Sequence, residues 1–168
     1  PGVMRNPGAF GNAWIVSNID WVSTPNEEIK AIEITDVKTT AIVNDEFRNV
    51  IGDFKPSVSK GTILLASYKP NELIYNFNSS KDELVVFSEI WTSKGWTMWI
   101  DGKESPLIRA DYILRAAVVP AGNHEIMMRY EPKIWKVGNT IQFVSSLILI
   151  LGLFVAIFVT YKKSVSKQ

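Results

Sequence analysis

Three tryptophans lie within one short stretch of the chain, EIWTSKGWTMWIDGKE, which runs from Glu89 to Glu104. Exposed aromatic rings on a β-sheet can stack against a bound sugar, whereas the same rings inside the sheet are core residues. Strand alternation places Trp96 on an apolar face, while Trp99 shares its face with a threonine and an aspartate. Trp91 flanks the loop TSKG. Trp91 and Trp99 are therefore candidate ligand-binding residues, and structural packing stays open as the alternative.

A second polar cluster follows in IRADYILR, residues 108–115. An extended backbone would place Arg109, Asp111 and Arg115 on one side of this segment. Tyr112 would then point to the opposite side. Arginine offers a planar fork of hydrogen-bond donors that suits a phosphate or a sugar hydroxyl, so the three charged residues are candidate ligand-binding residues. The alternative is an internal salt bridge that orders a loop near a sheet edge.

The other residues offer no active site. His124 is the only histidine in the sequence, and one histidine without a second ligand does not make a zinc site. The absence of cysteine excludes disulfides and thiolate chemistry, and no phosphate-binding loop, nucleophile elbow or paired-carboxylate motif is present. The net charge is +1, from 18 basic and 17 acidic residues, which argues against nucleic acid as a partner. We predict no catalytic residue, metal or cofactor in this chain.

Alternating apolar and β-branched runs, cut by clusters of Gly, Pro, Asn and Ser, fill the chain from Ala13 to Pro132. They predict an all-β domain, an antiparallel and jelly-roll-like β-sandwich. The segment STPNEEIKAIEI is an exception, because a Thr, a Pro and acidic residues in that order indicate the start of a short helix. The expected strands are 13–17, 39–43, 62–68, 72–78, 84–91, 96–100, 107–108, 114–119 and 125–130.

Three local features refine this prediction. Asp101-Gly102 suits a two-residue hairpin turn with positive φ at both positions. Pro106 lies inside a possible strand, so that strand is an edge or is broken there. The segment LVVFSEIW, residues 84–91, is largely apolar on both faces, which predicts a central strand covered on both sides.

The last quarter of the chain contains IQFVSSLILILGLFVAIFVTY, 21 residues without a charge. A helix of this length spans about 31 Å, the thickness of the hydrocarbon core of a bilayer. Tyr161 and Trp135 are candidate interfacial aromatics at its two ends. The predicted parts are a β-sandwich domain at 1–132, a linker at 133–140, a transmembrane helix at 141–161 and a tail at 162–168.

Basic residues flank the predicted span on both sides. Three lysines follow it, beginning at Lys162, and three basic residues precede it at a greater distance, ending at Lys136. This bias favours a cytoplasmic tail and a β domain on the outer side of the membrane. Because the sequence starts with neither an initiator Met nor a signal peptide, we expect a fragment of a longer protein.

An ordered run of motifs precedes the predicted membrane helix: Gly95-Trp96, Asp101-Gly102-Lys103, Arg115, the turn from Pro120 to His124, and Tyr130 with Pro132 at the exit into the helix. The motif NPGAFGNAW lies near the start of the chain. The ordered run resembles the C-terminal portion of YfhO-type bacterial membrane proteins, and NPGAFGNAW resembles family members from Bacteroidota. The resemblance covers the chain from Asn6 to about Tyr161.

The resemblance implies a larger protein. YfhO-type proteins are polytopic and similar to the GT-C class of glycosyltransferases, which use lipid-phosphate-linked sugars on the outer side of the cytoplasmic membrane. Their expected catalytic acid lies in a loop after the first membrane helix, so no catalytic residue carries over to this chain. The implied location is the bacterial cytoplasmic (inner) membrane, with the β domain on the periplasmic or extracellular side. The implied partners are the lipid bilayer, the rest of the parent protein and a lipid-linked sugar or glycan.

Two functions stay open on the sequence. The chain is either an accessory domain and last membrane helix of a membrane glycosyltransferase, where it assists substrate binding or scaffolding, or a non-enzymatic, membrane-anchored β domain for protein interaction or structure. An independent hydrolase has no residue support.

Overall fold

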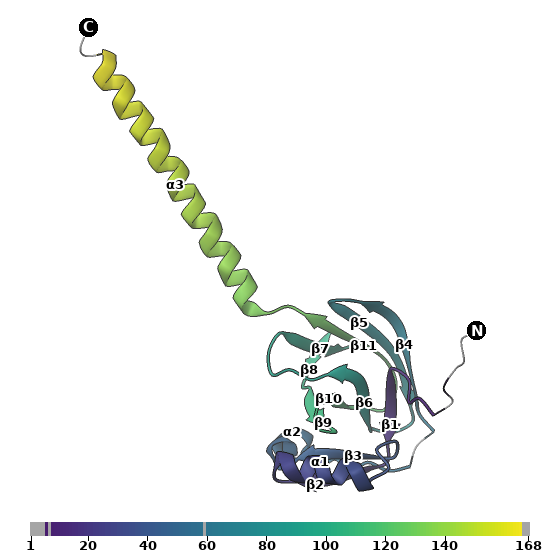
Figure 1. Ribbon diagram of the computed structural model, residues 1–168. Coiled ribbons are helices and arrows are strands. Elements are labelled where there is room, and N and C mark those ends of the chain that lie inside the picture. Colours follow the sequence, from purple (N-terminus) through teal and green to yellow (C-terminus); the bar gives the residue numbers. More distant parts are fainter. Residues whose placement is uncertain (1–5, 7, 59, 166–168) are drawn as a thin grey trace, which may run out of the picture. The chain divides into compact units, whose positions relative to one another are not determined.

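The computed structural model of the chain describes residues 6, 8–58 and 60–165 (Figure 1). The chain divides into two compact units, Pro1–Tyr130 and Glu131–Gln168. The first unit is a β domain, and the second carries one long helix.

Two β-sheets form the β domain, and in Figure 1 they lie as two layers. The six-stranded sheet has the order β1-β6-β10-β9-β3-β2, and the five-stranded sheet has the order β4-β5-β11-β7-β8. The six-stranded sheet comprises β1 (Ala13–Val16), β6 (Glu83–Ile90), β10 (Leu114–Val119), β9 (Ile108–Ala110), β3 (Thr40–Asn44) and β2 (Asn18–Val22). The five-stranded sheet comprises β4 (Thr62–Lys69), β5 (Glu72–Ser79), β11 (Gly122–Tyr130), β7 (Trp96–Ile100) and β8 (Lys103–Ser105).

The predicted all-β fold with a C-terminal apolar helix is confirmed, and every expected strand has a counterpart. Sequence reasoning missed β2 and β8: KES is short and contains no apolar residue, whereas NIDWV does alternate polar and apolar residues and could have been recognised as a strand. It also expected only antiparallel pairs, whereas β2 and β3 are parallel. Parallel neighbours need a crossover connection, and helix α1 (Pro25–Ile34) supplies it. The other pairings among the described strands are antiparallel.

The hydrophobic core confirms the prediction that residues 84–91 form a central strand. Strand β6 pairs with β1 on one side and β10 on the other. Val85 and Phe87 belong to the cluster that packs between the two sheets, where Phe87 meets Tyr75 of β5 edge to face at 5.1 Å. Leu84 and Val86 belong to a second cluster on the opposite face of the six-stranded sheet. Side-chain alternation therefore buries both faces of this strand.

Two other local predictions are confirmed. Asp101 and Gly102 have φ of 49° and 80°, as a two-residue hairpin turn between β7 and β8 requires. The chain is interrupted at Pro106, because β8 ends at Ser105 and β9 begins at Ile108. The hairpin matters for the site because it holds Asp101 opposite β11.

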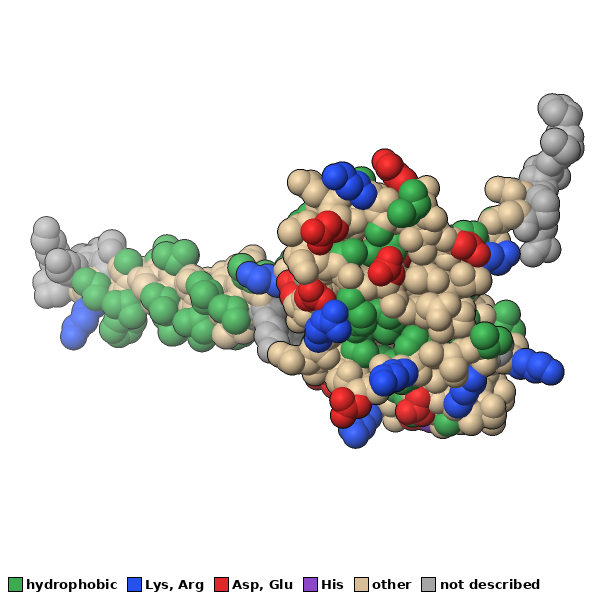
Figure 2. Space-filling view, turned by 90° about the horizontal axis from the view of Figure 1, so that it is seen from below, with side chains coloured by type: hydrophobic (Ala, Val, Ile, Leu, Met, Phe, Trp, Pro, Cys, Tyr) green, Lys and Arg blue, Asp and Glu red, His purple; other side chains and the backbone are tan. Residues whose placement is uncertain are grey.

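The second unit contains helix α3 (Lys133–Val165). Residues 133–140, expected to form a linker, are helical, and the apolar part of the helix runs from Val137 to Val159, 23 residues with a mean hydropathy of 2.6. Figure 2 shows hydrophobic side chains along the visible face of this helix. Its length and composition allow it to cross a membrane. Residues 166–168 of the predicted tail lie outside the described residues.

The short helices η1 (Asp45–Phe47) and α2 (Arg48–Ile51) follow β3 directly. Asn44 caps the first of them, since its side-chain oxygen accepts a hydrogen bond from the backbone N–H of Glu46 at 3.1 Å. Glu46 of η1 and Glu28 of α1 are the acidic side chains that meet Arg109 of β9.

Candidate functional site

The five residues predicted to bind a ligand do not form one cluster. Trp91 and Arg109 contact each other, and Arg115 is the cross-strand neighbour of Arg109 in β10. Asp111 lies in the turn between β9 and β10, and Trp99 lies in β7 of the other sheet.

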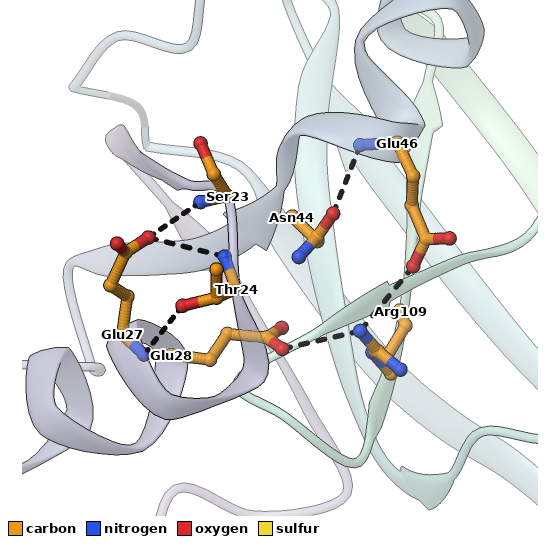
Figure 3. Close-up of polar contacts among 7 residues, drawn as sticks. All are labelled: Ser23, Thr24, Glu27, Glu28, Asn44, Glu46 and Arg109. Atoms are coloured by element: carbon orange, nitrogen blue, oxygen red, sulfur yellow. Dashed lines mark hydrogen bonds and ion pairs between the residues drawn. The ribbon is translucent and has the colours of Figure 1, made fainter.

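Arg109 forms an internal ion-pair network rather than an open anion site. One of its terminal nitrogens, Nη2, lies 3.2 Å from Oε2 of Glu28 and 3.3 Å from Oε1 of Glu46 (Figure 3). The Glu28 side chain is completely buried, and this burial raises its pKa, while the charge of Arg109 opposes the rise. The network therefore connects α1 and η1 to β9. The sequence left an internal salt bridge open as the alternative to a ligand site at Arg109, and this network is such a salt bridge. Its acidic partners are Glu28 and Glu46 and not Asp111.

The start of helix α1, which the sequence indicates, determines where the Glu28 side chain lies. Thr24 caps α1: its hydroxyl accepts from the backbone N–H of Glu27 at 3.3 Å, and a Glu27 carboxylate oxygen accepts from the backbone N–H of Thr24 at 3.1 Å (Figure 3). This reciprocal capping box determines the first turn of the helix. The next residue, Glu28, then points toward Arg109 in β9.

Trp91 is part of the packing around Arg109. Its ring meets the ring of Phe47 edge to face, with centroids 6.0 Å apart, and the guanidinium carbon of Arg109 lies 5.8 Å from its centroid. The backbone N–H of Trp91 donates to the carbonyl of Ile113 at 2.7 Å. The ring remains half-buried. These contacts account for Trp91 structurally and leave part of its surface open to a ligand.

Arg115 is a buried cation at the edge of the inter-sheet space. Only 3% of the residue is exposed, and its guanidinium carbon lies 4.0 Å from the centroid of Trp96. Trp96 packs in turn against Tyr130, the last residue of β11, with centroids 5.5 Å apart. Gly95, at a φ of 96°, lies against the Tyr130 ring, so any side chain at this position would collide with it. Three motifs of the sequence, Gly95-Trp96, Arg115 and Tyr130, thus pack together at the end of β11, shortly before α3 begins.

The prediction that residues 108–115 form one extended segment is wrong at Asp111. Strand β9 ends at Ala110, and Asp111 and Tyr112 have left-handed φ values of 48° and 69°. The backbone N–H of Asp111 donates to the Ile42 carbonyl at 2.8 Å, and its Oδ1 accepts from the Ile42 N–H at 2.9 Å. Its other oxygen, Oδ2, has no hydrogen-bond partner within the described chain. Burial raises the pKa of Asp111 to about 6.

Trp99 lies on the outer face of the five-stranded sheet. Its neighbours along β7, Met98 and Ile100, belong to the core, so alternation directs Trp99 away from it. Its cross-strand neighbours are Met127 and Glu104, and its ring is half-buried. This is the partial exposure that the sequence indicated, well separated in the fold from Arg109.

Sequence reasoning missed a pair formed by Asp101 and His124. A carboxylate oxygen of Asp101 lies 2.5 Å from Nδ1 of His124, and its other oxygen accepts from the Glu125 backbone N–H at 2.9 Å. The hydrogen bond to Asp101 raises the pKa of His124, and the same bond lowers the pKa of Asp101. The signal was available, because both residues belong to the motifs quoted above, but their pairing depends on the register of β7 and β11.

This pair predicts a pH-dependent contribution to stability. The contribution of His124 is fully present below pH 6.5 and is lost as pH rises through its raised folded pKa. The contribution of Asp101 is present above pH 3.8 and is lost as pH falls through its lowered pKa. Asp101→Asn keeps the turn, since Asn-Gly suits it equally well. In urea unfolding, we expect this variant to cost more stability at pH 5.5 than at pH 9; an equal cost at both would contradict the pair.

The charged groups described above are paired or buried, and the aromatic rings among them are partly exposed. Among the described residues, no group of three or more His, Cys, Asp or Glu side chains could hold a metal ion. The ionisable groups with raised or lowered pKa values are engaged in pairs or buried within the fold. What the β domain offers is half-buried aromatic surface and, beside Asp111, a groove.

Comparisons with known proteins agree with the motifs. Residues 55–142, just over half of the chain, match the family model described as "Bacterial membrane protein YfhO". The chain is also similar to the "Uncharacterized protein YfhO" of Bacillus subtilis (strain 168), with 29% identity over 84 residues. That alignment covers 50% of this chain but only 10% of the Bacillus protein. No solved structure matches the chain.

Proposed function

The chain belongs to the YfhO family of bacterial membrane proteins, and from this we propose that it is the C-terminal extracytoplasmic domain and last membrane helix of a polytopic glycosyltransferase that uses a lipid-phosphate-linked sugar. In this proposal the β domain assists substrate binding or scaffolding, and the reaction takes place elsewhere in the parent protein.

The observation that carries the proposal is the combination of a well-packed β-sandwich and, directly after it, a helix that is long and apolar enough to cross a membrane, in a chain of the YfhO family. The alignment with the Bacillus protein covers about a tenth of the length of that protein. Most of a protein of that length would therefore lie outside this chain. An accessory role fits a small piece of this kind better than an independent enzyme does. The proposed partners are the bilayer, the remainder of the parent protein and a lipid-linked sugar or glycan.

The proposed orientation places residues 1–132 on the periplasmic or extracellular side and 162–168 in the cytoplasm. It is supported by the lysines that follow the span, Lys162 and Lys163, because positive charge favours the cytoplasmic side. A third lysine, Lys167, lies outside the described residues. The family resemblance favours the same orientation.

Single cysteines test this orientation, since the chain has none of its own. Ser93 lies in the exposed loop before β7, and Ser164 lies at the other end of the span. In cells that produce the full-length protein, with any cysteines elsewhere replaced, we expect a small membrane-impermeant maleimide to label Ser93→Cys. Ser164→Cys should react only after the membrane is permeabilised. The reverse labelling pattern would place the β domain in the cytoplasm and overturn the orientation.

A further inference from the structure

Two motifs that the proposed function leaves unexplained meet in one groove. The groove has a volume of about 690 Å³, within the range of small-molecule sites. Its lining includes residues 8–12 and Trp14 of the motif NPGAFGNAW, together with Asp111 and Ile113 of the turn after β9, in IRADYILR. Ser88 also lines the groove.

The groove contains a carboxyl group with unused hydrogen-bonding capacity. Asp111 is 7% exposed, and its Oδ1 is occupied by the backbone N–H of Ile42. Its Oδ2 has no partner among residues 6, 8–58 and 60–165. A buried polar oxygen without a partner is costly unless something supplies a donor. This oxygen has almost no exposed surface, so a ligand hydroxyl would meet that need by inserting between the side chains that cover it.

Aromatic side chains line the same groove. Phe10 and Trp14 meet edge to face with centroids 5.0 Å apart. The indole N–H of Trp14 donates to the Val37 carbonyl at 3.1 Å, which holds the ring in place. The ring therefore contributes apolar surface to the groove, while its polar atom is satisfied elsewhere.

Exposed polar groups lie at the edge of the groove. Asn12 and Ser88 are both exposed, and the backbone N–H of Ser88 donates to the Asn12 carbonyl at 2.8 Å, so the two residues are held side by side. Their side chains offer an amide and a hydroxyl for further hydrogen bonds. The groove thus combines an aromatic surface with three short polar side chains.

We propose that the groove between the segment 8–14 and the turn at Asp111 binds a sugar residue. The apolar face of the sugar ring would pack on Trp14, and a hydroxyl would donate to the Asp111 carboxyl group. A bare phosphate is disfavoured, because Asp111 and the nearby Glu28 both carry acidic groups and Arg109 is engaged with Glu28 and Glu46. The proposal deepens the proposed function and rests on it, since the sugar would belong to the glycan on which the parent protein acts.

The test is a binding titration of the whole chain in an amine-oxide detergent, because a detergent with a sugar headgroup would compete. The probes are methyl β-glucoside and methyl β-N-acetylglucosaminide, followed by saturation-transfer NMR and tryptophan fluorescence. We expect saturable binding of at least one probe. Asp111→Asn should weaken it by about tenfold, the value of one hydrogen bond to a charged group. Ile113→Trp should fill the groove and abolish binding.

The control is Asp53→Asn, which changes an exposed aspartate of a loop outside the groove and should leave binding unchanged. If Ile113→Trp does not fold, Asp111→Asn still decides, because asparagine retains the acceptor for Ile42 and tolerates left-handed φ. Absence of saturable binding, or binding that both groove variants leave intact, would overturn the inference. That result would leave the proposed function standing if the full-length protein still transfers sugar.

Discussion

Arg109→Met is expected to lower the free energy of unfolding by about 3 kcal/mol, the lower end of the cost of breaking a buried ion pair by removing one partner. The cost arises from Glu28, the partner that remains in the variant. The Glu28 side chain is completely buried and has Arg109 as its ion-pair partner, so the variant leaves a carboxylate in an apolar environment. Glu46 is exposed enough to be hydrated without the arginine. Urea unfolding at pH 7 measures the change.

The same variant should show a characteristic pH dependence. Without Arg109, the folded pKa of Glu28 rises further above its unfolded value of 4.5. Glu28 of the folded variant then holds a proton that the unfolded chain releases. The loss of stability relative to the wild type should therefore become smaller as pH falls toward 4. The control is Lys69→Met, which removes an exposed lysine from Glu72 and should cost less than about 1 kcal/mol, because Glu72 keeps its ion pair with Arg129. A penalty for Arg109→Met as small as that of the control would contradict the network.

The double variant Glu28→Leu with Arg109→Met provides a second check. It removes both charges, so no buried charge remains without a partner, and it should recover much of the stability lost in the single variant. If the double variant is as unstable as the sum of the two single changes, the residues do not act as a pair.

Asp111→Asn is expected to stabilise the protein at pH 8 by about 1–3 kcal/mol. The pKa of Asp111 is about 6 in the folded state against 3.8 for an ordinary aspartate, and roughly two units correspond to about 3 kcal/mol at most. Ionising this buried group therefore costs stability above pH 6. Asparagine avoids that cost and can still accept the hydrogen bond from Ile42.

The sign of the pH effect distinguishes this account from a simple packing change. Between pH 3.8 and about 6 the folded protein holds a proton on Asp111 that the unfolded chain releases, so the stability of the wild type falls as pH rises through this window. Asp111→Asn should remove that part of the slope, which unfolding curves at pH 4, 6 and 8 would reveal. A variant that loses stability relative to the wild type as pH rises from 4 to 8 would show that the ionised carboxylate is favourable and would contradict this account.

Local patterns in the sequence were sufficient for much of the fold. Alternation in residues 84–91 identified a strand buried on both faces, and β6 is that strand. Asp101-Gly102 identified a hairpin turn because its backbone requirement is local. The start of α1 could be read for the same reason, since the capping box lies within four residues.

The candidate site could be predicted only in part, because its contacts join residues far apart in sequence. Arg109 meets Glu28 across 81 positions and Glu46 across 63. These pairings depend on the parallel β2–α1–β3 crossover, which places α1 beside β9. No local sequence pattern predicts this crossover. The turn at Asp111 was missed because IRADYILR contains no glycine or proline to indicate left-handed backbone.

The motifs that suggested the family acquire a structural explanation. Gly95-Trp96, Arg115 and Tyr130 pack together where β11 leads into α3. Asp101 of the hairpin binds His124 of the following turn motif. Much of the motif run therefore describes how the β domain is built, which agrees with a supporting role for this part of the parent protein.

The central claim is that this chain serves a glycosyltransferase that uses a lipid-phosphate-linked sugar. Transfer of a labelled sugar from such a donor by the full-length protein in proteoliposomes tests it most directly, with a version that lacks residues 1–132 of this chain as the comparison. We expect the full-length protein to transfer the label and the shortened version, if it still inserts, to lose most of its activity. Absence of any transfer by the full-length protein would contradict the claim, and full activity of the shortened version would contradict the accessory role.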